Sequence, residues 1–228
     1  MIQEFPLEPF MLPSRADRLQ KAAAQRTRSL AIVLDGVHDQ HNLSAVVRSC
    51  EGFGILDLHV IETHAPFRIG SSVTQGAEKW LDIHRYLQPE DCIAALAASR
   101  LEIWLANPAP GSIEVSEVTW QKPIALVFGN EHEGPSQAMQ KNASGSFHIP
   151  MLGFSQSLNI SVAAGITLAT GVAERIRRLG KHGDLSQSEQ SDLIAQWQRR
   201  SVKYADKILA RLNKELSSED ETSEKIRK

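Results

Sequence analysis

The residues whose chemistry and spacing first point to a site lie in the stretch IPMLGFSQSLNISVAAG, residues 149–165. A short apolar piece breaks at Pro150, loops through Gly153, and presents Ser157 and Asn159 just before a run of helix formers. Ser and Asn side chains at the start of a helix accept hydrogen bonds from its first free N–H groups, so helix capping is one interpretation. A ligand bound at the mouth of the helix is the other. This stretch alone leaves both open.

Two further stretches have the composition of binding loops. VFGNEHEGPS, residues 127–136, passes through Gly129 and Gly134, where the backbone can approach a ligand closely because no Cβ intervenes. It lacks the spacing and the Lys-Ser/Thr pair of a phosphate loop, and the chain has no GxGxxG, so nucleotide interpretations are weak. In HNLSAVVRSCEGFG, residues 41–54, Arg48 falls roughly opposite the apolar stripe of an expected helix. An arginine there is usually just solvated.

The elements that must position these stretches alternate between buried strands and amphipathic helices. Apolar runs predict strands at 30–34, 56–61, within 80–86, and at 101–106, 124–128 and 147–149. Helical spacing and terminal signals predict helices at 14–25, 42–53, 89–99, 136–141, 157–179 and 188–216. The alternation predicts an α/β fold, with a mostly parallel sheet and helices on both faces. Ligands in such folds bind at the carboxyl ends of strands.

The composition is that of a cytoplasmic protein with a sizeable core. The chain has 228 residues, of which 42% are hydrophobic. Cys50 and Cys92 are far apart and form no CxxC pair, which speaks against a disulfide framework or a zinc site. No cluster of His, Cys and Asp suggests any other metal. The amino terminus lacks a signal-peptide pattern, and the most apolar helix-like run, residues 162–173, is too short to span a bilayer.

The distribution of charge is more informative than the net charge of −2. Basic residues gather in 15–28, 175–181 and 199–211, whereas acidic residues concentrate in 215–224. A nucleic-acid-binding domain normally carries a basic patch, and these segments could form one. Charge runs are equally often solvated helix faces, so both interpretations remain.

Taken together, the stretches HNLSAVVRSCEGFG, LVFGNEHEGPS and IPMLGFSQSLNISVAAG resemble the three motifs of the SpoU (TrmH-type) branch of the SPOUT RNA methyltransferases, in the same order and spacing. The resemblance covers about residues 30–178. It implies transfer of a methyl group from S-adenosylmethionine to a ribose 2′-hydroxyl of RNA. It also implies a deep trefoil knot in the C-terminal part and a homodimer. The expected organisation is a basic helical extension (1–29), a SPOUT methyltransferase domain (30–180), and a C-terminal helix with an acidic tail (181–228).

The resemblance also implies roles for individual residues. Arg48 matches the family's catalytic arginine, and its companions in catalysis match Asn42, Glu131, Ser157 and Asn159. The methyl donor's adenine would be flanked by Ala106, Gly129, Ile149 and Leu158. A guanidinium has a pKa above ~12 and no free acceptor, so Arg48 is a poor base. It can instead lower the pKa of the ribose hydroxyl or hold the adjacent phosphate through charge-assisted hydrogen bonds. No metal is required.

The flanking segments indicate which RNA is the substrate. A short basic N-terminal helix and a C-terminal helix around the knot resemble the enzymes that methylate guanosine 18 of tRNA, as does GAEKW at 76–80. Arg18 matches a basic position of their N-terminal helix. Those enzymes carry a basic pair after the last knot helix. Here the corresponding residues are Arg175, Arg177 and Arg178, in a different register. Asp39 and Gln40 replace the usual Lys-Pro. The alternatives are methylation of ribosomal RNA and an inactive RNA-binding knot protein, which the intact catalytic set disfavours.

Overall fold

The computed structural model describes residues 5–62 and 68–214, which divide into two compact units. The larger unit spans residues 26–184 and contains the whole sheet. The smaller unit combines the described residues 5–25 and 185–214. The two terminal extensions thus form one unit, because helix α1 (Pro13–Ala24) packs against helix α7 (Gln187–Ser201). The acidic tail expected at 215–224 lies outside the described residues.

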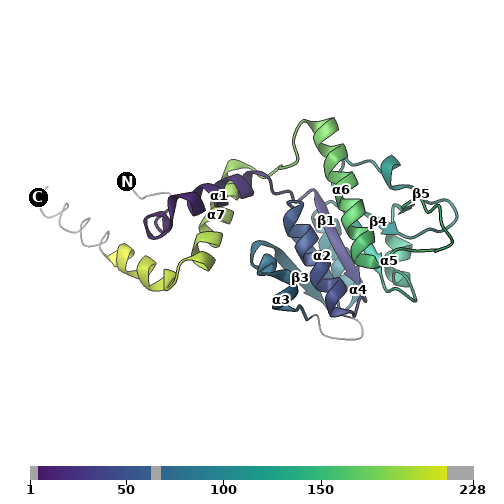
Figure 1. The fold of residues 1–228 in the computed structure, drawn as a ribbon, viewed down its shortest axis with the longest axis horizontal. Coiled ribbons are helices and arrows are strands. Elements are labelled where there is room, and N and C mark those ends of the chain that lie inside the picture. Colours follow the sequence, from purple (N-terminus) through teal and green to yellow (C-terminus); the bar gives the residue numbers. More distant parts are fainter. Residues whose placement is uncertain (1–4, 63–67, 215–228) are drawn as a thin grey trace, which may run out of the picture. The chain divides into compact units, whose positions relative to one another are not determined.

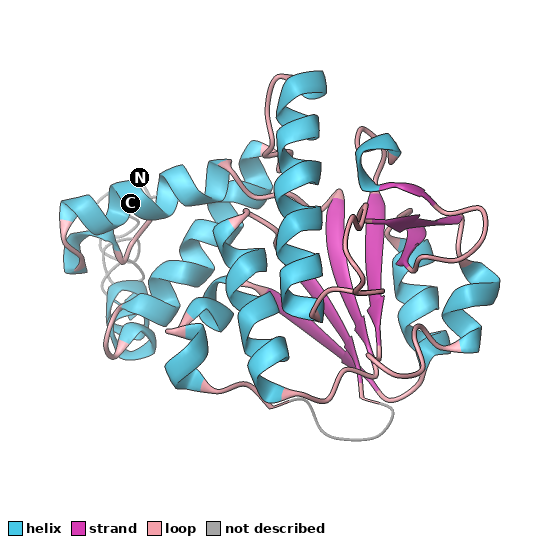
Figure 2. Ribbon diagram, turned by 45° about the vertical axis from the view of Figure 1, so that its right-hand side comes forward, coloured by secondary structure: helices cyan, strands magenta, loops and turns pink. Residues whose placement is uncertain are grey.

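Seven strands form the sheet, and every neighbouring pair is parallel. Their order is β3 (Asp82–Tyr86), β2 (Asp57–Ile61), β1 (Leu30–Asp35), β6 (Ile124–Gly129), β4 (Glu102–Ala106), β7 (Gly145–His148) and β5 (Ile113–Glu114). The predicted parallel α/β architecture is confirmed. Because all strands point the same way, their carboxyl ends lie at the same end of the sheet (Figure 2).

Helices cover both faces of the sheet, as predicted. Successive side chains of a strand point to opposite faces, so Ile32 of β1 joins one core and Val33 joins the other. The first core contains the apolar stripes of α2 (Gln40–Gly52) and α6 (Ile160–Leu179), which lie side by side in Figure 1. The second contains those of α4 (Pro89–Ala98) and α5 (Gln137–Asn142).

Two of the predicted helices differ from the structure. The helix expected at 157–179 begins at Ile160, because Asn159 adopts an extended conformation and serves as its N-cap. The helix expected at 188–216 is interrupted at 202–204, where Tyr204 has a φ of 61°, and residues 205–214 are helical again. Strand β5 and the short helices α3 (Ser71–Thr74), η1 (Glu8–Phe10), η2 (Ala77–Trp80) and η3 (Val115–Glu117) were not predicted. Such short elements contain too few residues to show a period.

The smaller unit has a core of its own. Leu19 and Ala23 of α1 are buried, as are Leu193 and Trp197 of α7. A capping box starts α7, in which the Ser186 hydroxyl accepts from the Glu189 N–H and the Glu189 carboxylate accepts from the Ser186 N–H. The buried side chains pack α7 against α1, and the capping box sets where α7 begins. Within the described residues, no helix combines the length and apolar character needed to cross a membrane.

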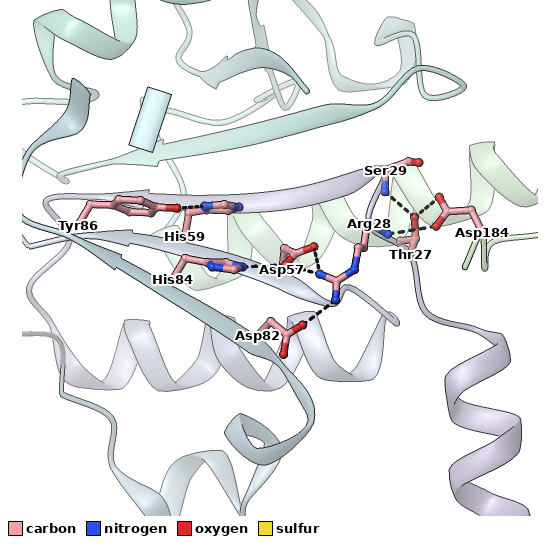
Figure 3. Close-up of polar contacts among 9 residues, drawn as sticks. All are labelled: Thr27, Arg28, Ser29, Asp57, His59, Asp82, His84, Tyr86 and Asp184. Atoms are coloured by element: carbon pink, nitrogen blue, oxygen red, sulfur yellow. Dashed lines mark hydrogen bonds and ion pairs between the residues drawn. The ribbon is translucent and has the colours of Figure 1, made fainter. Parts of the chain in front are cut away.

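Polar side chains tie strands β1, β2 and β3 together away from the carboxyl ends (Figure 3). Arg28 Nη1 lies 2.7 Å from Asp57 Oδ1, and Arg28 Nη2 lies 2.8 Å from Asp82 Oδ2. His84 Nε2 lies 2.8 Å from the same Asp57 oxygen, and this contact raises the pKa of His84. These ion pairs join the segment before β1 to β2 and to the outermost strand, β3.

Candidate functional site

Three polar side chains from distant parts of the chain meet in one hydrogen-bonded row at the carboxyl edge of the sheet. Asn42 Nδ2 donates to Glu131 Oε1 over 2.9 Å. Asn159 Nδ2 donates to Asn42 Oδ1 over 3.0 Å. Asn42 lies in the first turn of α2, Glu131 follows β6, and Asn159 precedes α6. The structure therefore brings together one residue from each of the three stretches that sequence reasoning selected.

Helix capping positions two members of this row. The Asp39 carboxylate caps α2 by accepting from the Asn42 N–H at 2.7 Å, so the departure from Lys-Pro at this point has a structural role. Asn159 Oδ1 caps α6 by accepting from the Ser161 N–H at 2.9 Å. Its Nδ2 is the atom that reaches Asn42. The capping interpretation of this stretch is therefore confirmed for Asn159, whereas Ser157 lies before the cap.

The loop that presents Glu131 is folded tightly back on its strand. Asn130 Oδ1 accepts from the backbone N–H groups of His132 and Glu133, at 2.8 and 3.3 Å. A Cβ on Gly129 would lie 2.1 Å from the backbone nitrogen of Pro135, so only glycine fits. Gly134 takes a φ of 71°, a conformation that favours glycine. The sequence GNEHEGP thus encodes one fixed turn with Glu131 at its tip.

Beside this row lies a cavity of about 510 Å³. It is lined by the four residues expected to flank adenine, Ala106, Gly129, Ile149 and Leu158, and also by Glu131 and Ser157. Its volume is within the range of small-molecule sites, roughly 300–1,000 Å³. The ends of β4 and β6, the loop before α6 and the first two turns of α6 form its walls.

The chemistry of the cavity wall suits a purine nucleoside. Phe128, Phe147 and Ala163 give it apolar surface, and backbone groups of the two loops give it polar atoms. Thr167, which is fully buried, also lines the cavity, and its hydroxyl has no hydrogen-bond partner among the described residues. A buried hydroxyl without a partner is costly, so a polar ligand atom or a water molecule would stabilise it. Sequence reasoning missed Thr167, because an interior helical threonine carries no distinctive pattern.

The catalytic arginine and the RNA-binding arginines expected from the resemblance are not among the described residues that line the cavity. Arg48 is exposed on α2, and it is not among the described residues that line the cavity. Arg18 is exposed on α1, within the smaller unit. Arg177 and Arg178 are exposed near the end of α6, and both pair with Glu174, at 2.6 and 2.9 Å. Hydrogen bonds from these two arginines lower the pKa of Glu174 to about 2.

Arg175 does not fit the RNA-contacting role expected for it. Its side chain is only 2% exposed, and Nη2 lies 3.0 Å from Asp184 Oδ2. Nη1 donates to the backbone oxygen of Trp120 at 3.1 Å. Burial lowers the pKa of Arg175, and Asp184 opposes that shift. Along α6, Arg175 falls on the same face as buried Leu168 and Gly171. Counting the charges in 175–181 took no account of which face of the helix each residue occupies. We therefore assign Arg175 to the interior and leave it out of the RNA surface.

Asp35 is a further residue that sequence reasoning did not select. It is 2% exposed at the carboxyl end of β1, and its Oδ2 accepts from the Ser136 N–H at 2.7 Å. This contact fastens the end of the Glu131 loop to the central strand. The signal in the sequence that could have identified Asp35 is a single Asp at the end of an apolar strand. Among the described residues, no group of three or more His, Cys, Asp or Glu side chains is arranged to hold a metal ion.

Comparison with known proteins gives consistent matches. The model of the SpoU rRNA Methylase family matches residues 29–169. The tRNA (guanosine(18)-2′-O)-methyltransferase of Aquifex aeolicus is 31% identical, over 86% of this chain and 94% of that relative. The protein of the same name from Escherichia coli K12 is 26% identical, over 81% of this chain and 82% of its own.

Solved structures agree. The crystal structure of the A. aeolicus TrmH/SpoU tRNA modifying enzyme matches with a TM-score of 0.75 and 31% identity, over 83% of this chain and 98% of that one. The SpoU methyltransferase AviRb from Streptomyces viridochromogenes, in complex with AdoMet, matches with a TM-score of 0.61 and 25% identity. That match covers 71% of this chain and 64% of AviRb.

Proposed function

The chain belongs to the SpoU rRNA methylase family, and from this premise we propose that it transfers a methyl group from S-adenosylmethionine to the ribose 2′-hydroxyl of guanosine 18 in tRNA. The family's name mentions ribosomal RNA. The A. aeolicus relative, however, is named for guanosine 18 of tRNA and is matched over nearly its whole length, extensions included. That near-complete match favours tRNA over ribosomal RNA.

The observation that carries this proposal is the position of the Asn42–Glu131–Asn159 row beside the cavity. The cavity suits a purine nucleoside, and the row supplies amide and carboxylate groups next to it. A binding module without catalysis would need only one of these two features. Their juxtaposition supports a transfer reaction between a bound nucleoside and a second substrate.

We assign the methyl donor to the cavity, where Ala106, Gly129, Ile149 and Leu158 would hold its adenosine. S-adenosylmethionine, when bound, supplies a methyl group activated as a sulfonium. The loops around it come from separate chain segments, 130–135 and 149–159, and the family resemblance implies that they belong to a trefoil knot. A knotted wall would restrict opening of the site and keep its geometry fixed.

We assign the acceptor side to the polar row and to Arg48. Asn42 and Asn159 hold the Glu131 carboxylate in one position, and Ser157 adds a hydroxyl at the cavity wall. The guanidinium of Arg48 can donate charge-assisted hydrogen bonds, so it would lower the pKa of the ribose hydroxyl or bind the neighbouring phosphate. These groups position the hydroxyl and stabilise the charge that develops on its oxygen.

We also propose that the chain works as a C2 homodimer. Val162, Ile166 and Ile176 form an exposed apolar stripe along α6, at 48%, 38% and 49% exposure. Leu152 and Phe154, in the loop before α6, are fully exposed. Exposed apolar surface of this extent marks interaction sites. Ile166→Glu should shift the mass in solution from dimer to monomer, and Arg100→Glu, a charge change at an exposed residue after α4, serves as the matched control.

The RNA surface would include Arg18, Arg177 and Arg178, whose side chains are exposed. Arg177 and Arg178 would exchange Glu174 for phosphates. As an enzyme acting on tRNA, the protein would work in the cytoplasm.

The deciding experiment is to map the methylated nucleotide. The purified protein is incubated with labelled S-adenosylmethionine and either a tRNA transcript, the same transcript with 2′-deoxyguanosine at position 18, or ribosomal RNA. We expect methylation of the first alone. Methylation of ribosomal RNA but not of tRNA would establish the alternative substrate. Donor binding without transfer to either RNA would indicate an inactive RNA-binding protein.

A further inference from the structure

The break between α7 and the following helix places an aromatic side chain on the surface of the smaller unit. Residues 202–204 leave the helical path, and the chain becomes helical again at residue 205. Within this break Tyr204 is 63% exposed, whereas the next residue, Ala205, is buried at 5%. Ala205 thus anchors the turn while Tyr204 points away from the core.

Tyr204 has a backbone conformation that is unfavourable for its residue type. Its φ of 61° lies in the left-handed region, where a bulky side chain costs free energy and glycine does not. An exposed ring contributes little burial to offset that cost. Strain at an exposed residue is a reason to look for a function.

Two lysines flank the ring. Lys203 Nζ lies 5.1 Å from its centre, and Lys207 Nζ lies 5.5 Å from it. Both distances are within the range of cation–π interactions. The three side chains thus bring one exposed ring and two ammonium groups, both over the ring, together inside the basic run 199–211. The nearby Asp206 carboxylate pairs with Arg199 at 2.6 Å. It therefore compensates the charge of that arginine and not the charges of the two lysines.

An aromatic ring beside ammonium groups is the combination that binds unpaired nucleotides. Every base has a face that stacks on a ring, and the adjoining phosphates are attracted to lysines. Protein–protein interfaces are enriched in tyrosine but depleted in lysine relative to the rest of the surface. The charge and the ring therefore favour a nucleic acid over a protein.

We propose that Tyr204, Lys203 and Lys207 form a stacking platform for an unpaired base of the RNA substrate. This inference rests on the proposed function for the identity of the RNA. It assigns to the C-terminal extension a direct contact with a base and its phosphates. The platform binds RNA and takes no part in methyl transfer.

The test compares Tyr204→Gly, Tyr204→Phe and wild type in the full-length protein. Glycine removes the ring and also relieves the left-handed strain, so this variant should fold at least as stably as wild type. Phe keeps the face that stacks. We expect Tyr204→Gly to weaken binding of a tRNA transcript about tenfold, and Tyr204→Phe to bind within about twofold of wild type. Binding of S-adenosylhomocysteine should be the same in all three.

The lysines have a separate signature. Lys203→Gln with Lys207→Gln should reduce the slope of log affinity against log salt by about one to two units, while Tyr204→Gly leaves the slope unchanged. Lys122→Gln, at an exposed lysine paired with Glu102 in the larger unit, is the matched control. At saturating RNA the single-turnover rate should equal that of wild type in every platform variant.

The two proposals fail in different ways. If wild type binds tRNA but transfers no methyl group to guanosine 18, the proposed function is wrong, while the binding comparison still tests the platform. If Tyr204→Gly folds and binds tRNA as tightly as wild type, the platform is wrong whatever the enzyme methylates. If the variant changes the mass in solution instead of RNA affinity, Tyr204 belongs to a protein interface and the inference is overturned.

Discussion

Asn42 and Asn159 stand 117 positions apart in the chain and share one hydrogen bond of 3.0 Å. Each lies at the start of a helix, and each owes its position to a cap at that helix start. The bond joins the first and third motifs, and Glu131 of the second motif attaches to the same Asn42 side chain. The site is thus assembled from helix starts and one tight loop.

The two functions of Asn159 can be separated by substitution. Asn159→Asp keeps the oxygen that caps α6 but loses the amide that donates to Asn42. We expect its thermal midpoint to stay close to wild type and its kcat to fall by about ten- to a hundredfold. Asn159→Ala loses the cap as well, at about 1 kcal/mol of folding stability. Equal losses of stability in both variants would show that the bond to Asn42 serves the fold.

Arg48 should act on the reaction and not on donor binding. Its side chain is exposed on α2 and is not among the described residues that line the cavity. We expect Arg48→Ala to lower kcat by about 10²–10³-fold, as loss of a preorganised charge donor typically does. The affinity for S-adenosylhomocysteine, measured by titration calorimetry, should change by less than about twofold. Arg48→Lys keeps the charge without the planar fork, so partial activity is expected. Normal turnover by Arg48→Ala would remove it from the catalytic set.

Gly129 should not tolerate a side chain. A Cβ there would lie 2.1 Å from the Pro135 nitrogen, so Gly129→Ala must displace the loop that carries Glu131. We expect a loss of about 1–3 kcal/mol of stability and at least tenfold weaker donor binding. Gly165→Ala is the matched control, because a Cβ at that helical position meets nothing within 4 Å. Similar behaviour of the two variants would contradict the loop's fixed geometry.

Arg175 and Arg177 are near neighbours in sequence with opposite expected effects. Arg175→Met removes the buried partner of the ion pair and leaves Asp184 only its hydrogen bonds from Thr27 and the Arg28 N–H, which should destabilise the protein by about 3 kcal/mol. Arg177→Met alters an exposed pair and should change stability by about 0.5 kcal/mol or less, while weakening tRNA binding. Urea unfolding and tRNA titration on both variants check this. If Arg175→Met folds stably and binds tRNA more weakly than wild type, Arg175 contacts RNA after all.

Stability should fall in mild acid because of His59. Burial, with a smaller effect from the charge of His84, lowers the pKa of His59 to about 4 from an ordinary 6.5. Between these values the unfolded chain binds the proton and the folded protein does not, so stability decreases as the pH falls from 6.5 towards 4. His59→Gln, which can still bond to Tyr86, should flatten the dependence of the thermal midpoint on pH over that range.

His84 contributes with the opposite sign. Its pKa is raised, chiefly by the hydrogen bond to Asp57 (Figure 3). The resulting stability is fully present below pH 6.5 and is lost as the pH rises through the folded-state pKa. His84→Gln should therefore abolish the part of the stability loss that wild type shows as the pH rises above 6.5. An unchanged profile in both variants would show that neither histidine dominates the acid dependence.

The sequence by itself determined the architecture and several of the residues that meet at the candidate site. Apolar runs such as LAIVL at 30–34 and the helical spacing of 42–53 are local patterns, and they predicted a parallel α/β sheet and most of its helices. The resemblance of three short motifs selected Asn42, Glu131 and Asn159, which the fold brings into one row, and the four residues now found in the cavity wall. Local patterns succeed here because strands and helices bury one face along a fixed period.

Only the tertiary structure decided which polar groups are paired, buried or free. A run of charges gave no sign that Arg175 turns inward to Asp184, because that contact depends on where the chain returns after α6. The bond between Asn42 and Asn159, the clash that forbids a Cβ at Gly129, and the outward turn at Tyr204 likewise depend on segments distant in sequence or on a break in a periodic pattern. Hydrogen bonds and ion pairs reach only about 3–4 Å, so their partners are set by the packing of whole elements and not by local sequence.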